Sequence, residues 1–150
     1  IHIHFIGGIR GEWATNLLDY VMNSKYINCM TFHGFVNNSL EFIYAADLIL
    51  LPSRAEGQPL AVLEAMALGK VVVTTNYEGI EEVIDNEKSG FIIDLDNFDD
   101  LILDVLYQIY TNNEQKALIE SEAKIKYIKD FSIAKQKEKI IILINEITRN

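Results

Sequence analysis

The sequence predicts an α/β fold, in which a doubly wound, Rossmann-like parallel sheet is flanked by helices. The first observation is that short runs rich in β-branched residues alternate with helical patterns, the order expected of repeated strand–helix units. The second is that residues 48–51 and 71–73 are continuously apolar. We therefore expect these two strands to be buried on both faces, as in a parallel sheet.

The elements follow from hydrophobic periodicity along the chain. Short apolar runs favour strands, at residues 1–7, 29–34, 47–51, 70–75 and 90–94. Helical patterns separate them, at residues 12–25, 39–46 and 59–68, with a single helical turn at 79–84. From residue 97 onward the pattern is helical to the end, with breaks near 112–113 and 130–132.

Length and composition indicate one globular domain. The chain has 150 residues, of which 49% are hydrophobic and 23% charged, enough to bury a core. The formal net charge of −9 argues against nucleic acid or an anionic membrane as a broad electrostatic partner, because both attract basic proteins. We expect membrane contact, if there is any, to be peripheral. The single cysteine, Cys29, cannot form an internal disulfide, which fits a reducing cytosol.

The chain has no apparent signal peptide, and no aliphatic run in it is long enough to cross a bilayer. We expect a cytoplasmic location, including the inner face of the membrane. The chain begins directly in a strand pattern without a Met. We therefore expect residues 1–150 to be a piece of a longer protein.

Ligands of open α/β sheets bind outside the carboxyl ends of the strands. Glycines in the loops expected there, among them Gly8, allow the backbone to approach a ligand closely, so Gly8 is a candidate binding residue. Its loop lacks G-x-G-x-x-G spacing, which favours a plain turn over a dinucleotide loop. The histidines have no Cys or carboxylate at metal-ligand spacing, so we expect no metal site.

The start of the helix at 59–68 is a candidate anion site. Pro59 is expected as the first helical residue, and the residue before it, Gln58, is not one of the usual capping residues. The amides of Leu60, Ala61 and Val62 would then lack a side-chain acceptor, and such free amides bind phosphate. The alternative is that water or the Gln58 side chain satisfies them.

Glu64 lies in the middle of this apolar helix, which we expect to be buried on every side. A buried carboxylate without a partner is costly, so Glu64 needs hydrogen-bond donors. It lies roughly 7–8 Å along the axis from Pro59, about the reach of a ribose linked to a pyrophosphate at the helix start. The alternatives are an ion pair with Arg54 or Lys70, or a position on a solvent-facing edge.

The stretch PSRAEGQPLAVLEAMALGKVVVTT resembles the signature of the retaining, nucleotide-sugar-dependent glycosyltransferases of family 4 (group 1), which have the GT-B fold. Glu56 and Glu64 are separated by seven residues, with Glu-Gly-x-Pro at the start and Leu-Glu-Ala-Met-Ala at the end. The likeness extends to FHGFV, YAADLILLPS and EGIEEVIDNEKSGFIID. It implies that residues 1–150 are the donor-binding C-terminal half of a GT-B fold, truncated at the N-terminal edge and without the acceptor domain.

The resemblance implies a role for each matching position. Glu56 would be the catalytic residue, in contact with the donor sugar's hydroxyls near the reacting carbon. Glu64 would bind the ribose hydroxyls. The backbone would hold the rest of the donor. The backbone of Gly57, Gln58 and Pro59 would line the sugar pocket. The amides of Leu60 and Ala61 would bind the distal phosphate, and the Val36 backbone would lie against the base.

The implied reaction transfers a sugar from a UDP- or GDP-sugar to a glycan or glycolipid acceptor with retention, in bacterial surface polysaccharide or glycolipid synthesis. The acceptor attacks on the face from which the leaving group departs, and the protein mainly stabilises charge on the leaving pyrophosphate. No cofactor or metal is expected. Family members clamp the pyrophosphate with an Arg and a Lys that would precede residue 1. We expect the fragment alone to be inactive, because the half of the active-site cleft that the acceptor domain supplies would be missing. Glu81 stands where the family commonly has proline.

Three alternatives remain open. A non-catalytic, glycosyltransferase-like binding or scaffold module is disfavoured because both glutamates are retained. A receiver-type signalling domain would need aspartates after the first strand, where Gly7 and Gly8 stand. A glycosidase pair of acid and nucleophile is disfavoured because Glu64 would lie inside a helix, facing away from the sugar.

Overall fold

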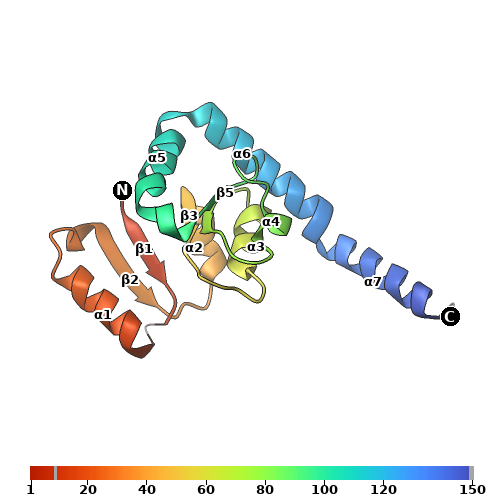
Figure 1. Cartoon of the computed structure of the whole chain (residues 1–150), viewed down its shortest axis with the longest axis horizontal. Coiled ribbons are helices and arrows are strands. Elements are labelled where there is room, and N and C mark those ends of the chain that lie inside the picture. Colours follow the sequence, from red (N-terminus) through yellow and green to blue (C-terminus); the bar gives the residue numbers. More distant parts are fainter. Residues whose placement is uncertain (9, 149–150) are drawn as a thin grey trace. The chain divides into compact units, whose positions relative to one another are not determined.

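A computed structural model gives the structure of residues 1–8 and 10–148, and the chain divides into two compact units, Ile1–Glu41 and Phe42–Asn150. Each unit is a parallel α/β arrangement, and each is described by itself (Figure 1). The five strands lie close to the positions that the sequence predicts. They form one two-stranded and one three-stranded sheet.

The first unit is built on strands β1 (Ile3–Ile6) and β2 (Met30–Gly34), which pair in parallel with Ile3 opposite Met30. Helix α1 (Gly11–Met22) and the short 3-10 helix η1 (Ile27–Cys29) connect them. Such a parallel pair requires a crossover, and the helical pattern between the strands provides it. The helix ends three residues before its predicted end.

The second unit contains the three-stranded sheet, in the order β3-β4-β5, with all pairs parallel. Its strands are β3 (Leu48–Leu51), β4 (Val71–Thr75) and β5 (Phe91–Ile93). Helix α2 (Ser39–Ala45) leads into this unit. The sheet's other connections and the C-terminal part are helical: α3 (Leu60–Ala67), α4 (Ile80–Val83), η2 (Leu95–Asn97), α5 (Phe98–Thr111), α6 (Asn113–Lys126), η3 (Tyr127–Phe131) and α7 (Ile133–Thr148).

Helices cover both faces of this sheet, as expected of a doubly wound fold. Successive side chains of a strand point to opposite faces. Val72 of β4 therefore belongs to one buried cluster, with residues of α3 and α4, whereas Val71 and Val73 belong to another, with residues of β5, α5 and α6. All five residues of β4 are buried, which confirms the expectation for this strand.

The same expectation is wrong for β3. Three of its four residues are half-buried, and the Leu50 side chain is 41% exposed. The physical reason is that β3 is an edge strand of the three-stranded sheet, whereas β4 is its central strand. An apolar run by itself does not distinguish the two positions.

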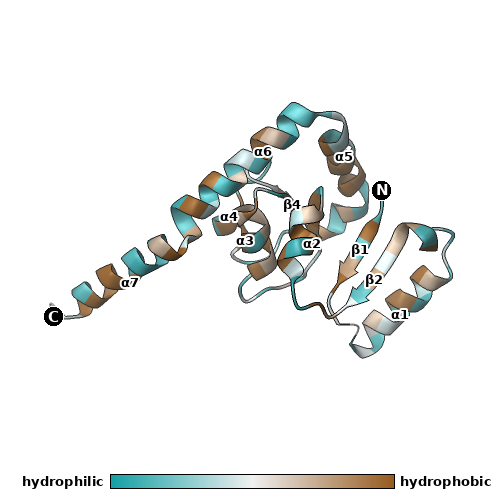
Figure 2. Cartoon of the chain, turned by 180° about the vertical axis from the view of Figure 1, so that it is seen from behind, coloured by the Kyte–Doolittle hydropathy of each residue, from teal (hydrophilic) through white to brown (hydrophobic). Residues whose placement is uncertain are grey.

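The two breaks predicted in the C-terminal part are present. Asn112 caps α6, where its side-chain oxygen accepts a 3.0 Å hydrogen bond from the Gln115 amide. The second break is a single π-helical turn, η3, followed by Ser132. Helix α7 carries apolar and polar residues in alternation (Figure 2). It extends to Thr148, and the expected helix at residues 149–150 lies outside the described part.

Across residues 1–8 and 10–148, no helix combines the length and the apolar character that a bilayer span requires.

Candidate functional site

A pocket of about 240 Å³ lies at the carboxyl ends of β3 and β4. Its wall comes from four parts of the second unit. They are residues 56–59 after β3, Leu63 of α3, residues 77–79 with α4 after β4, and Phe131 of the π-helical turn. This is the position at which open α/β sheets bind ligands.

The loop after β3 is held by the neighbouring strand. The Ser53 amide donates to the Leu51 carbonyl at 2.9 Å, and the Ser53 carbonyl accepts a short hydrogen bond from the Thr75 hydroxyl of β4. The Ser53 hydroxyl in turn donates to Glu56 Oε1 at 2.6 Å. Glu56 is exposed and lines the pocket, so a solvent-accessible carboxylate is fixed at its edge.

The start of α3 differs in two details from the prediction. Pro59 has non-helical dihedral angles (φ −80°, ψ 69°) and is the N-cap, so the first helical residue is Leu60. No side chain caps this end, as predicted. The expectation that the Leu60 amide is free is wrong, because it donates to the Gln58 carbonyl at 2.8 Å.

Two amides remain available at this helix end. The first helical hydrogen bond runs from the Leu63 amide to the Pro59 carbonyl at 3.1 Å. The amides of Ala61 and Val62 find no acceptor among the described residues. Since the positive end of the helix dipole lies here, the arrangement suits an anion.

Glu64 is less buried than predicted. Helix α3 buries one side, with Val62, Ala65 and Met66, while Leu60 is 58% exposed. The helix is therefore not covered all round, and Glu64 is half-buried. Within the described part of the chain its carboxylate forms no hydrogen bond or ion pair, so neither Arg54 nor Lys70 is its partner. Glu64 does not line the pocket that Glu56 lines.

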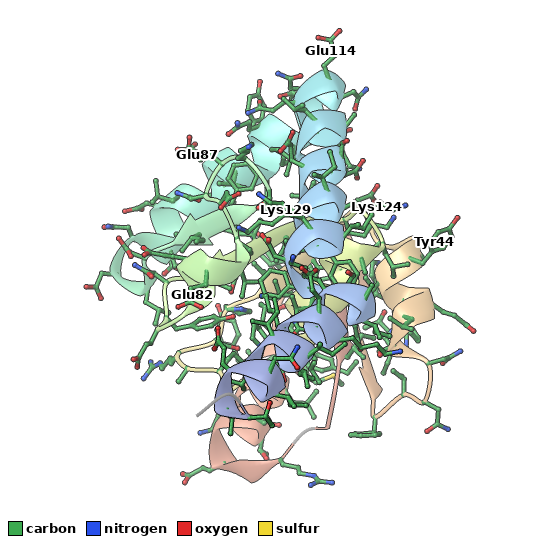
Figure 3. The ribbon with its side chains drawn as sticks, turned by 90° about the vertical axis from the view of Figure 1, so that its right-hand side faces the viewer. Tyr44, Glu82, Glu87, Glu114, Lys124 and Lys129 are labelled. Atoms are coloured by element: carbon green, nitrogen blue, oxygen red, sulfur yellow. The ribbon has the colours of Figure 1, made fainter. Side chains whose placement is uncertain are left out.

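The segment after β4 closes the pocket on its other side. Gly79 lines it and is the N-cap of α4 with φ +86°, a left-handed conformation in which any side chain would be strained. Glu78 and Glu82 also line the pocket, and both are exposed. Figure 3 shows Glu82 on α4, on the opposite side of the view from Tyr44 and Lys124.

Tyr77 is the buried polar residue of the wall. Its side chain is 7% exposed, and its hydroxyl is buried without a hydrogen-bond partner among the described residues. Burial raises the pKa of this phenol; the nearby Thr74 side chain lowers the pKa, and the charge of Glu56 raises it. The Thr74 hydroxyl donates to the Leu51 carbonyl at 2.9 Å.

The sequence did not single out Tyr77, Glu78 or Phe131. The first two directly follow a strand end at which a ligand was expected, which is a weak signal for them. Phe131 carries no local signal, because only packing of the C-terminal helices brings it to this wall.

A second hollow, of about 350 Å³, lies beyond α4. It is lined by Glu81, Asp85 and Asp94 together with two asparagines. Asn76 donates to Asp94 Oδ1 at 2.9 Å, and Asp85 pairs with Lys126 at 3.0 Å. Its polar groups are therefore partly engaged with one another.

Gly8 and Val36 belong to the first unit, where they follow the carboxyl ends of β1 and β2. Gly8 is exposed and Val36 half-buried. On the same strands, His4 Nδ1 lies 2.9 Å from His33 Nε2. Among residues 1–8 and 10–148, no group of three His, Cys, Asp or Glu side chains is placed to hold a metal ion.

Comparison with known proteins gives a family match and several relatives. The model of the family described as "Glycosyl transferases group 1" matches residues 1–112. The chain is 32% identical over 107 residues to the Escherichia coli UDP-Gal:alpha-D-GlcNAc-diphosphoundecaprenol alpha-1,3-galactosyltransferase, covering 71% of this chain and 27% of the relative. It is 35% identical over 79 residues to the Campylobacter jejuni N,N'-diacetylbacillosaminyl-diphospho-undecaprenol alpha-1,3-N-acetylgalactosaminyltransferase, covering 51% and 21%. The chain thus spans about a quarter of the length of the curated relatives it matches.

Solved structures show the same fold. Anabaena Alr3699/HepE in complex with UDP and glucose superposes with a TM-score of 0.87 at 20% identity, covering 97% of this chain and 40% of that one. A glycosyltransferase from Rickettsia africae has a TM-score of 0.87 at 24% identity, covering 100% and 41%. At these identities the likeness concerns the fold.

Proposed function

The chain belongs to the group 1 glycosyl transferases, and we propose that within this family it is the part that binds a nucleoside-diphosphate-sugar donor. Its parallel sheets flanked by helices have the Rossmann-like fold of GT-B glycosyltransferases. We further propose that the enzyme belongs to family 4 and retains the anomeric configuration, and that residues 1–150 form part of the C-terminal half of its GT-B fold.

One observation carries this proposal. The Glu56 carboxylate, fixed by Ser53, lines a pocket whose wall includes residues 57–59, and the uncapped start of α3 follows directly. A carboxylate accepts hydrogen bonds from sugar hydroxyls, and free helix amides bind phosphate. A sugar and a phosphate therefore find suitable groups next to each other.

The donor would lie across these groups in order. The sugar would occupy the pocket, against Glu56 and the backbone of Gly57, Gln58 and Pro59. The distal phosphate would accept hydrogen bonds from the backbone amides of Ala61 and Val62. The Val62 amide replaces the Leu60 amide, which was predicted for this role but is bonded to the Gln58 carbonyl. The ribose would reach the unpartnered Glu64. Val36, for the base, and Gly8 stay proposed donor contacts.

In the proposed reaction the acceptor hydroxyl attacks the anomeric carbon on the face from which the diphosphate leaves. The new glycosidic bond forms as the old one breaks, the acceptor's proton passes to the leaving phosphate oxygen, and the configuration is retained. Helix amides stabilise the charge that develops on the diphosphate. We propose no metal or other cofactor. We also propose that the fragment alone does not turn over, since a further domain would complete the active-site cleft.

The relatives suggest the pathway. Two of them carry names of transferases that act on diphosphoundecaprenol-linked sugars, and others are named for colanic acid, amylovoran or O-antigen biosynthesis. We propose that this protein acts in bacterial surface polysaccharide or glycolipid synthesis, in the cytoplasm or at the inner face of the membrane. The donor would be a UDP- or GDP-sugar, and a further domain would bind the glycan or glycolipid acceptor.

The test is calorimetric titration of the protein, produced in full from its gene, with UDP, GDP and ADP. This is followed by a sugar-transfer assay of wild type and Glu56→Gln. We expect one nucleotide to bind, and we expect the substitution to abolish most transfer while leaving nucleotide affinity within about twofold. Absence of binding at millimolar nucleotide would contradict the donor-site proposal and favour a scaffold module.

A further inference from the structure

We propose that Thr75 is a positioning residue of the donor site, whose buried hydroxyl fixes the orientation of Glu56 by way of Ser53. The proposal rests on the proposed function, because Glu56 is the residue that Thr75 would position. It concerns a residue of the central strand β4 that lies outside the pocket wall and outside the two-glutamate motif. Its substitution should therefore affect sugar transfer without affecting nucleotide binding.

The backbone pairing of β3 with β4 ends just before the loop that follows β3. Leu51 is the last paired residue of β3, opposite Thr74. The next residue, Pro52, has no backbone amide and cannot donate to a ladder. On its other side β4 continues one residue further, where Thr75 pairs with Ile93 of β5. The loop therefore needs other contacts to keep its place beside the central strand.

Two side-chain hydroxyls of β4 supply such contacts. The Thr74 hydroxyl donates to the carbonyl of Leu51, still within β3, at 2.9 Å. The Thr75 hydroxyl donates to the carbonyl of Ser53, the first residue after Pro52. Both threonines are fully buried, so water does not readily replace either hydroxyl as a donor. The Thr75 hydroxyl thus extends the pairing of the two strands into the loop.

Ser53 connects this hydrogen bond to the carboxylate. Its amide donates to the Leu51 carbonyl at 2.9 Å and its carbonyl accepts from Thr75, so its backbone is held at two atoms. Its hydroxyl donates to Glu56 Oε1 at 2.6 Å. Glu56 is exposed, so packing does not orient its side chain. The orientation of Glu56 therefore depends on Ser53, and the position of Ser53 depends on Thr75.

Sugar transfer is sensitive to such an orientation. A misplacement of about 1 Å in a group that acts on the substrate can cost about 100-fold in rate. The amides of Ala61 and Val62, which would hold the phosphate, belong to a different element, helix α3. Loss of the Thr75 hydroxyl should therefore slow transfer and leave nucleotide affinity unchanged. A purely structural role of Thr75 would not separate the two.

The experiment uses the protein produced in full from its gene. Thr75→Val and Thr75→Ala remove the hydroxyl, and Thr75→Ser keeps it. Ser53→Ala, alone and combined with Thr75→Val, tests whether the two residues act through one contact. Ser89→Ala is the matched control. The Ser89 hydroxyl is also buried, and it accepts a 2.9 Å hydrogen bond from the Asp85 amide in a turn outside the pocket wall.

Three measurements are made on each variant. Calorimetry gives the Kd of UDP and of GDP. UDP-glucose, UDP-galactose, UDP-N-acetylglucosamine and GDP-mannose are tested as donors, and kcat is measured with the most active one, as release of the nucleoside diphosphate. Thermal unfolding gives the stability of each variant.

We expect Thr75→Val and Thr75→Ala to lower kcat about three- to tenfold, while the Kd of the nucleotide stays within about twofold of wild type. Thr75→Ser should restore kcat to within about twofold of wild type. Ser89→Ala should lower Tm and leave kcat unchanged. The double variant should be no slower than the slower of its two single variants, because the same contact is lost in each.

Four results would overturn the proposal. A wild-type kcat in Thr75→Val and Thr75→Ala would show that Glu56 does not depend on this hydroxyl. An equal loss of kcat in Ser89→Ala would indicate a general loosening of the fold. Effects of Ser53→Ala and Thr75→Val that multiply in the double variant would make the two residues independent. A wild type that binds neither UDP nor GDP would refute the donor site itself, so the two failures can be told apart.

Discussion

The hydroxyl of Ser53 donates a 2.6 Å hydrogen bond to Glu56 Oε1, three residues further along the same loop. The Ser53 backbone is itself bonded to the carbonyl of Leu51 in β3 and to the hydroxyl of Thr75 in β4. The carboxylate at the pocket's edge is therefore tied to the ends of two neighbouring strands, which orients a side chain that is otherwise exposed.

Replacing Ser53 with alanine tests this arrangement. We expect Ser53→Ala to lower kcat for sugar transfer about three- to tenfold, because a hydrogen bond to a charged group stabilises by up to about 1.5–3 kcal/mol and exposure reduces that value. The Kd of the nucleotide should not change, because the Ser53 hydroxyl bonds Glu56 and not the amides of Ala61 and Val62. Ser53→Thr, which keeps the hydroxyl, is the control. Unchanged kcat in the alanine variant would show that Glu56 needs no such support.

Glu64 is expected to bind the nucleotide rather than the sugar. Its half-buried carboxylate has no protein partner in the described part of the chain, and it lies outside the wall that Glu56 lines. We expect Glu64→Ala to weaken nucleotide binding at least tenfold, about 1.4 kcal/mol, by calorimetry. The matched control is Glu146→Ala, an exposed glutamate on α7. Equal affinities of the two variants would exclude Glu64 from the site.

Tyr77 should make the free energy of unfolding depend on pH in the alkaline range. Its pKa is raised above 10.0, chiefly by burial, so the native state keeps the phenol proton where the unfolded chain has lost it. Above about pH 10 the unfolded state then binds fewer protons, and the free energy of unfolding falls as pH rises. We expect a smaller fall in Tyr77→Phe, measured by urea unfolding between pH 8 and about 11. Parallel curves for the two proteins would contradict a raised pKa.

The core around α3 should be sensitive to truncation. Met66 is fully buried, in the cluster that joins α3 to one face of the sheet. We expect Met66→Ala to lower the free energy of unfolding by about 2–5 kcal/mol, through lost burial and the cavity left behind. Leu118→Ala, at a site on α6 that is 62% exposed, should cost well under half of that. Similar losses at both positions would show that α3 packs less tightly than described.

Much of the fold follows from local sequence. Strand β4 consists of five β-branched residues, and its boundaries lie within one residue of the prediction. The Asn112 cap and the break before Ser132 were also predictable, because capping residues act on the backbone a few positions away. The exposure of Leu50 was not, since it depends on which strand lies at the edge of the sheet.

The candidate site also has features that follow from local sequence and features that depend on tertiary packing. The sequence by itself determined the family, the two glutamates and the uncapped start of α3, because all of these lie within one short stretch of chain. Only the tertiary structure decided that Tyr77 and Phe131 join Glu56 in one wall, and that Glu64 stays outside it. The physical reason is that a pocket forms where strand ends and a distant helical turn pack together. No pattern of neighbouring residues in the sequence indicates that packing.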